Sequence, residues 1–389
     1  MNTQVTTLPA SAPSPTSGRD TATRPDPGPL AAAHTPNFPG LLRQLKSSLL
    51  VTTYQAGRLV MVRDEGNNLN THYRGFQAPM GLALAGGGSR LALGTATQVW
   101  DFRDVSSVAR RLEPAGTHDA CFLPRSIHYT GNIQIHEMAY GRGGELWVVN
   151  TRFSCLCTLD SESSFVPRWR PRFITELEPS DRCHLNGLAM VDGRPKYATA
   201  LGEFNAPAGW RANKARGGIL MDVDSGEIIC RGLSMPHSPR WHNGNLWVCE
   251  SGSGTLGMVD LKTGRYAPVV QAPGFTRGLE FVGDLAFVGL SQVRESAVFS
   301  GIPITERLAP EARTCGVCVV DLRAGKTVAL LKFTSGVQEV FAVAPLSRRF
   351  PDLINGDDKA GEGVLESSFV IPTECLKEVA PTVLASKPA

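Results

Sequence analysis

The sequence predicts an all-β protein, a six-bladed β-propeller in which strands from both ends of the chain complete one blade. The main observation is a repeat, because a short apolar strand restarts six times on a similar template. The apolar parts of these segments begin, at intervals of 40 to 61 residues, with Gly81, Glu137, Gly187, Ser238, Gly278 and Glu339. Tight turns such as Asp192-Gly193 and Asn243-Gly244 lead from several of them into a second strand. Repeats of roughly 40–50 residues that each contain a hairpin are typical of propeller blades.

Two of the repeats contain all four antiparallel strands that a blade needs. In the third repeat we expect strands over residues 187–191, 197–201, 218–222 and 228–233. In the fourth repeat the expected strands are more closely spaced and cover 239–241, 246–250, 255–260 and 266–270.

The two ends of the propeller sequence complement each other. The last restart, 338–345, is followed by no equally clear set of strands, whereas the apolar segments 49–54, 58–63 and 69–74 have no inner strand before them. Pairing the C-terminal inner strand with these N-terminal strands builds one blade from both ends and removes exposed sheet edges. A seventh blade is the alternative, if residues 102–132 or 291–314 contain a degenerate one.

The ends of the chain differ from the repeats in composition. Residues 1–38 are rich in Pro, Ser, Thr and Ala and lack apolar periodicity, so we expect a disordered tail. The propeller then spans 40–356, and 357–389 form a less regular C-terminal tail. No secretory signal and no run of about 18 apolar residues occurs, so we expect a cytoplasmic protein without membrane contact.

The charge balance argues against nucleic-acid binding. The chain has 39 Lys and Arg against 36 Asp and Glu, a net charge of +3, with no basic stripe for a phosphate backbone. A zinc site built from the nine cysteines is not expected either. Cys315 and Cys318 lie on one predicted strand and face opposite sides, while Cys155 and Cys157 have no second pair at finger spacing. We therefore expect buried, reduced cysteines.

Histidines mark one end of the predicted axial channel. Aligning the six restarts places one residue of each at the same level: Met80, His136, Asn186, His237, Arg277 and Gln338. His184 precedes Asn186 by two residues and therefore lies on the same strand face. We expect His136, His184 and His237 to hold a divalent transition metal (copper, iron or zinc) with Asn186 at its edge, because neutral imidazole is the commonest ligand of these metals. A polar channel or ligand pocket without metal is the alternative, since a one-residue slip would turn a side chain to the other face.

Charged residues beside these histidines are the catalytic candidates. Arg277 enters the channel, where its guanidinium group would clamp a carboxylate or balance an anion formed during reaction. Glu137 and Glu339 each follow a residue of the ring by one position and point away from the axis unless the register slips. If either turns inward, it becomes a general base or a fourth metal ligand.

Two strings carry a resemblance to known proteins: His184-Leu185-Asn186-Gly187 and Met235-Pro236-His237-Ser238-Pro239-Arg240-Trp241-His242. With them, residues 40–356 resemble a bacterial family of six-bladed propellers, conserved proteins of unknown function. More distantly, Asn186-Gly187-Leu188-Ala189 resembles the strand start of the gluconolactonase and strictosidine-synthase-like superfamily. In gluconolactonases an Asn at this point binds a divalent cation together with acidic residues of other blades. This chain has His136 and His237 where those carboxylates are sought, which favours a softer metal.

The sequence thus predicts a metal-dependent enzyme that acts on a small polar or anionic molecule at the channel mouth. Oxidation and hydrolysis remain open, because copper, iron and zinc all accept imidazole ligands. Two alternatives stay open beside it. One is a lactonase-like hydrolase, and the other is a non-catalytic propeller that binds a protein or another ligand over its faces.

Overall fold

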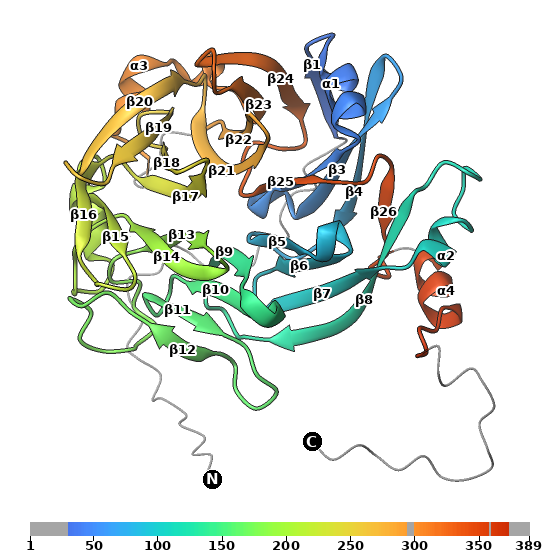
Figure 1. Ribbon diagram of the computed structural model, residues 1–389, viewed down its shortest axis with the longest axis horizontal. Helices are drawn as coiled ribbons and strands as arrows, with labels where there is room; N and C mark the ends of the chain where they lie inside the picture. Colours follow the sequence, from blue (N-terminus) through green and yellow to red (C-terminus); the bar gives the residue numbers. More distant parts are fainter. Residues whose placement is uncertain (1–29, 294–298, 358, 373–389) are drawn as a thin grey trace.

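Six sheets surround a common axis, each with its innermost strand beside that axis (Figure 1). The computed structural model describes residues 30–293, 299–357 and 359–372. Within these residues the chain is a six-bladed β-propeller, as the repeat predicted. We number the blades from 1 to 6 in chain order, starting with the blade that both ends complete.

The strands of the first three blades are given from the axis outward. Blade 1 contains β25 (Val343–Leu346), β2 (Ser48–Thr52), β3 (Arg58–Glu65) and β4 (Asn68–Gly75). Blade 2 contains β5 (Leu82–Ala85), β6 (Arg90–Gly94), β7 (Gln98–Asp104), β8 (Ala120–Tyr129) and the added edge strand β26 (Pro351–Leu353). Blade 3 contains β9 (Ile135–Tyr140), β10 (Leu146–Asn150), β11 (Cys155–Thr158) and β12 (Val166–Trp169).

The other three blades follow the same plan. Blade 4 contains β13 (Leu185–Val191), β14 (Arg194–Ala200), β15 (Gly218–Asp222) and β16 (Ile228–Leu233). Blade 5 contains β17 (Pro236–His242), β18 (Asn245–Glu250), β19 (Thr255–Asp260) and β20 (Arg265–Gln271). Blade 6 contains β21 (Phe275–Val282), β22 (Leu285–Ser291), β23 (Gly316–Asp321), β24 (Lys326–Ser335) and the added edge strand β1 (Ala31–His34). In blades 4 and 5 these strands agree closely with the expected ranges.

Two-residue turns fix the inner hairpins of blades 4 and 5. Asp192 and Gly193 have φ values of 49° and 70°, and Asn243 and Gly244 have 49° and 76°. Positive φ at both central positions is the type I′ turn, whose twist matches that of the paired strands. The local sequence therefore sets where these inner strands end.

Blade 1 is closed by both ends of the chain, as predicted. β25 runs antiparallel to β2, with Leu50 opposite Ala344. Just before β25 begins, the backbone N–H of Phe341 also donates a 2.8 Å hydrogen bond to the carbonyl of Thr52. The inner strand itself begins at Val343, five residues later than the expected 338.

The seventh blade is not found among the described residues. The segment 102–132 supplies the end of β7, the short helix α2 (Ser106–Ala109) and β8 of blade 2. The described part of 291–314 contains the short helices α3 (Pro303–Arg307) and η5 (Pro310–Ala312) between β22 and β23 of blade 6.

The prediction of a disordered tail over residues 1–38 is wrong for the last part of this range. Strand β1 pairs with β24, and α1 (Phe38–Leu45) begins at Phe38, whose side chain is fully buried. An edge strand such as β24 offers unpaired N–H and C=O groups, so even an Ala-rich segment can add to it. Residues 1–29 lie outside the described residues.

The C-terminal region also differs from the expected tail. Helix α4 (Lys359–Ser367) lies beside blade 2, near α2 (Figure 1). Residues 373–389 lie outside the described part of the chain. None of the described helices combines the length and the apolar composition that crossing a membrane requires.

The core is divided into layers between neighbouring blades. Cys315 packs with Val317 and Val319 in one layer, whereas Cys318 packs with Val320 in another, so the two cysteines face opposite sides as expected. The eight cysteines among the described residues are free and buried. Burial raises the pKa of the Cys183 thiol to about 12, so this cysteine is an inert core residue.

Candidate active site at the mouth of the axial channel

A cavity of about 600 Å³ opens where the inner strands begin. Its walls come from segments that precede or open these strands and from connections between strands further out in the blades, such as the one before β15. The residues that line it are Tyr54, Gln55, Gln77, Ala78, Met80, Ala96, Asn132, Gln134, His136, Asp181, His184, Trp210, Arg211, Arg277, Phe299, Glu339 and Phe341. Four of the residues selected from the sequence are therefore in this wall, namely His136, His184, Arg277 and Glu339.

The structure brings the three selected histidines together, although they come from three different blades. The ring centres of His136 and His184 lie 4.8 Å apart, with the rings perpendicular. The ring of His237 is nearly parallel to that of His136 at 6.4 Å, and His237 is buried and is not among the lining residues. His136 is thus the central member of the group.

His136 is held through one ring nitrogen. Its Nδ1 lies 2.8 Å from Thr151 Oγ1 and 3.1 Å from the carbonyl of Gln134. The Thr151 hydroxyl donates its own proton to the carbonyl of Leu185, so its oxygen accepts from the imidazole. Nδ1 therefore carries the proton and Nε2 carries the lone pair.

His237 repeats this arrangement two blades further on. Its Nδ1 donates to the carbonyl of Met235 at 2.9 Å and to Ser251 Oγ at 3.0 Å. The Ser251 hydroxyl in turn donates to the carbonyl of Thr276. Threonine and serine thus perform the same task after the second strands of blades 3 and 5.

His184 uses a carboxylate for the same purpose. Its Nδ1 lies 2.9 Å from Asp181 Oδ2, which also accepts a 3.1 Å hydrogen bond from the indole N–H of Trp210. The rings of His184 and Trp210 are 4.5 Å apart. In all three histidines Nδ1 is anchored, and Nε2 makes no hydrogen bond to any residue that the structure describes. This is the hydrogen-bonding state of metal-binding imidazoles.

Unusual backbone conformations support these anchors. Gln134 and Met235, each two residues before a histidine, have φ of 53° and 45°, and His184 itself has φ of 51°. The backbone carbonyls of Gln134 and Met235 each accept a hydrogen bond from the imidazole two residues later in the chain. Residues other than glycine rarely adopt this region, at a cost of roughly 1–3 kcal/mol each, and such strain clusters at functional sites.

The surroundings keep two of the imidazoles neutral. Burial lowers the pKa of His136 well below its usual value, and the neighbouring His184 and Arg277 side chains lower it further. Burial and the charge of Arg277 likewise hold the pKa of His237 well below its usual range. Neutral imidazole is the form that binds metals.

Arg277 lies beside this group. Its guanidinium carbon is 3.4 Å from the ring centre of Phe341, and that ring is 5.1 Å from His136. Nη1 donates to Glu339 Oε1 at 3.3 Å. Burial lowers the pKa of Arg277 to about 10, so the group stays charged at neutral pH.

Asn186 is buried next to the site but not in the cavity wall. Its Oδ1 accepts a 2.7 Å hydrogen bond from Thr199 Oγ1, and its buried Nδ2 has no hydrogen-bond partner within the described residues. The amide oxygen expected at the edge of a metal is therefore already engaged.

Glu137 lies elsewhere, which corrects its selection as a catalytic residue. Its carboxylate accepts from the backbone N–H of Leu188 at 2.7 Å and pairs with Arg240 Nη1 at 3.1 Å. Arg240 also bonds Glu280 at 2.8 Å, so four inner strands, β9, β13, β17 and β21, are tied together at the channel. Because this ion pair and the backbone amide use both carboxylate oxygens, we assign Glu137 a structural role.

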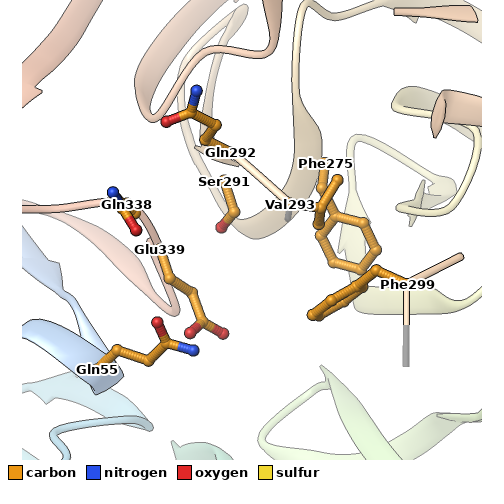
Figure 2. Close-up of a pocket in the computed structure, with 8 residues that line it drawn as sticks. All are labelled: Gln55, Phe275, Ser291, Gln292, Val293, Phe299, Gln338 and Glu339. Atoms are coloured by element: carbon orange, nitrogen blue, oxygen red, sulfur yellow. The ribbon is translucent and has the colours of Figure 1, made fainter. Parts of the chain in front are cut away.

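Gln338 is also displaced from the expected ring. It lines a second chamber of about 210 Å³, which shares Gln55, Phe299 and Glu339 with the main cavity (Figure 2). Phe341, three residues later, is the residue of this segment that faces His136 and Arg277. The sequence alignment of the six restarts did not show that Phe341 takes the place expected for Gln338, because the inner strand of blade 1 begins at Val343 instead of 338.

Several residues of the site were missed in the sequence. Thr151 and Ser251 could have been found, because each follows a matching second strand, Leu146-Trp147-Val148-Val149-Asn150 and Leu246-Trp247-Val248-Cys249-Glu250. Asp181 stands three residues before His184, a spacing that carried no signal without the turn between them. Trp210 lies in η4 (Gly209–Asn213) between β14 and β15, far in the sequence from any inner strand, so only the tertiary structure reveals it.

Across the described ranges, no group of three or more His, Cys, Asp and Glu side chains is arranged to hold a metal ion as it stands. The distances show where the arrangement is too wide. With metal–nitrogen bonds of about 2.0–2.1 Å, imidazole ring centres around one tetrahedral metal lie about 5 Å apart. The separation of His136 and His184, 4.8 Å, fits this value, whereas that of His136 and His237, 6.4 Å, exceeds it.

Comparison with known proteins identifies a family but no activity. No curated protein matches the chain. Solved structures that are similar include one of a nidogen–laminin complex, with 10% identity, a TM-score of 0.48 and coverage of 78% of this chain and 99% of that one. Another is a protein of unknown function from Bacteroides caccae, with 8% identity, a TM-score of 0.47 and coverage of 77% and 98%.

The similarity to gluconolactonases expected from Asn186-Gly187 rests on that sequence pattern alone. The family model for a domain of unknown function, DUF4915, matches residues 36–354, which is the propeller itself. The chain therefore belongs to the DUF4915 family of proteins of unknown function.

Proposed function

We propose that the axial cavity is the active site of a metal-dependent enzyme that acts on a small polar or anionic molecule. His136, His184 and His237 bind one transition metal, which is copper, iron or zinc, and the reaction is an oxidation or a hydrolysis. The observation that carries this proposal is the threefold anchoring of Nδ1, which leaves three Nε2 lone pairs for a metal.

Binding of the metal requires a small movement. His136 and His184 already have a separation that fits a ligand pair, and His237 closes toward His136 by about 1.4 Å to reach the spacing of about 5 Å. Three neutral ligands leave the charge of a divalent ion uncompensated. Such an ion acidifies a bound water or attracts an anionic ligand.

The cavity supplies groups to hold and orient the substrate. Arg277 presents a buried positive charge at the same wall, and Phe341 fixes its guanidinium group. Glu339 remains a catalytic candidate because its carboxylate lines the cavity, although it also pairs with Arg277. The ring of Trp210 and the carboxylate of Asp181 hold His184 in place.

Elemental analysis tests the metal proposal directly. The untagged full-length protein is incubated with zinc, copper or ferrous iron, freed of excess metal and analysed. We expect about one equivalent of one metal, and its loss in the triple variant His136→Ala, His184→Ala, His237→Ala. His242→Ala is the matched control, because His242 stacks on Phe281 at the other end of β17. A metal-free wild-type protein, or equal uptake by the triple variant, would contradict the proposal.

A second candidate is a propeller that binds a small molecule or a protein without catalysis. It is favoured by the 6.4 Å separation of His136 and His237, which leaves the described residues without a ready metal site. In that case the metal-free protein binds its ligand as tightly as the metal-treated protein does. A lactonase-like hydrolase is less favoured, because the carboxylates among the described lining residues, Asp181 and Glu339, are both engaged by other side chains.

A further inference from the structure

We propose that the molecule bound in the cavity is a zwitterionic α-amino acid. Its carboxylate binds Arg277, its ammonium group binds Glu339, and its side chain enters the second chamber. This inference rests on the proposed function in one respect, namely that the cavity binds a small molecule. It does not depend on the identity of the metal.

The first argument is the incomplete use of Arg277. Its side chain is 10% exposed, and Nη1 makes the single hydrogen bond that it forms with the described residues, at 3.3 Å to Glu339. Its other N–H groups make none to those residues, while the guanidinium plane is fixed over Phe341. A fixed guanidinium group with unused donors in a cavity wall matches the two oxygens of a carboxylate.

The second argument is charge balance. Arg277 and Glu339 are both largely buried and carry opposite charges, so together they are neutral. A simple carboxylic acid bound to the unused N–H groups of Arg277 would place a second negative charge beside Glu339 in a largely buried place, which is unfavourable. A ligand that also carries an ammonium group adds no net charge to the site.

The short distance within the pair sets the distance within the ligand. The nitrogen of Arg277 and the oxygen of Glu339 are 3.3 Å apart. The carboxylate and the ammonium group of the ligand must therefore be close neighbours too. In an α-amino acid a single carbon separates them.

The second chamber explains where the side chain goes. It begins at Glu339 and extends past Phe275, Val293 and Phe299, with a volume of about 210 Å³ (Figure 2). The rings of Phe275 and Phe299 meet edge to face at 5.6 Å on one side, and Gln55 lies near the Glu339 carboxylate on the other. Aromatic rings pack well on such a pair, and apolar burial favours them over glycine.

Calorimetric titration of the wild-type protein with natural L-amino acids tests this inference without any substitution. We expect saturable binding of amino acids with an aromatic or large aliphatic side chain, at least about tenfold tighter than that of glycine. For the tightest ligand, the amine lacking the carboxylate and the acid lacking the ammonium group should each bind at least about 100-fold more weakly. Equal or tighter binding of the acid, or no binding of any amino acid, would overturn the inference.

Two variants assign the charges. In Arg277→Gln the ligand carboxylate should no longer increase the affinity, so that the amine binds as well as the amino acid. Glu339→Gln should lose the preference for the ammonium group, so that the acid binds as well as the amino acid. The exposed pair Arg323 and Asp284 supplies the controls, Arg323→Gln and Asp284→Asn, which should bind like the wild type. Unchanged selectivity in both cavity variants would place the ligand elsewhere.

Metal analysis of the same samples separates this inference from the proposed function. A protein that takes up metal but binds no amino acid contradicts the inference alone. A protein that binds amino acids selectively but takes up no metal contradicts the metal-dependent reaction alone.

Discussion

Thr151 holds His136 through a 2.8 Å hydrogen bond, and the same contact recurs two blades further on, where Ser251 holds His237 at 3.0 Å. Each hydroxyl also donates to the first residues of the next inner strand, at Leu185 and Thr276. Each hydroxyl therefore fixes the orientation of a histidine and links two neighbouring blades. A buried hydroxyl that serves two blades is a sensitive point for mutation.

Substitution of these hydroxyls should separate orientation from folding. Thr151→Val keeps the shape of the side chain but leaves the imidazole of His136 with only the carbonyl of Gln134 as acceptor. We expect a loss of stability of about 1–2 kcal/mol and a 10- to 100-fold lower metal affinity. Urea unfolding and metal titration measure the two effects. Thr151→Ser, which retains the hydroxyl, should restore metal affinity, and failure to do so would contradict the orienting role.

The closure of blade 1 predicts a graded response to truncation. Removal of residues 1–29, which keeps β1 and every other described element, is the control. Removal of residues 1–35 also takes away β1 and its pairing with β24, which should cost about 2–4 kcal/mol of unfolding free energy. Removal of residues 1–75 deletes β2, β3 and β4, which leaves β25 unpaired and should prevent folding. A folded fragment 76–389, detected by circular dichroism, would refute this closure.

The ion pair across the channel predicts a structural effect of Glu137. Glu137→Ala removes one of the two carboxylates that compensate the buried Arg240 and leaves the N–H of Leu188 without its acceptor. We expect a loss of about 3 kcal/mol of unfolding free energy, with metal and ligand binding unchanged at low temperature. Glu137→Gln, which keeps a hydrogen-bond acceptor, should lose less. Loss of metal binding in a variant of normal stability would return Glu137 to the active site.

Acid should weaken the attachment of β26 to its neighbours. Burial would raise the pKa of Asp352, but His72 and Arg74 outweigh it and hold this pKa at about 2, below the ordinary 3.8. Arg74 Nη2 lies 3.2 Å from the carboxylate and His72 Nε2 lies 3.3 Å from it. Because the folded state binds its proton less readily than the unfolded state, the contribution is complete above about pH 4 and is lost as the pH falls toward 2.

The expected size of this contribution is about 2 kcal/mol at neutral pH. Urea unfolding of the wild type and of Asp352→Asn at pH 7 and pH 3 measures it. The wild type should lose more stability than the variant over this interval. An equal loss in both would mean that other groups carry the acid sensitivity.

The sequence by itself determined the architecture. The spacing of the repeats, the turns at Asp192-Gly193 and Asn243-Gly244, and the unpaired strands near residue 49 were enough to predict six blades and their closure. These signals are local, because alternation sets a strand and turn residues set its end. The positions of His136, His184 and His237 at the starts of inner strands were visible for the same reason.

The tertiary structure decided the direction and the partners of the side chains. The ladder of blade 5 shifts between His237 and Arg240, where Ser238 has φ of 49°, and that shift turns Arg240 toward Glu137. The late start of β25 places Phe341 rather than Gln338 beside the histidines. Such bulges and left-handed residues depend on contacts between blades, which a periodic pattern does not contain. The repeated sequence therefore determined which residues reach the channel mouth, and packing between the blades determined which of them face one another there.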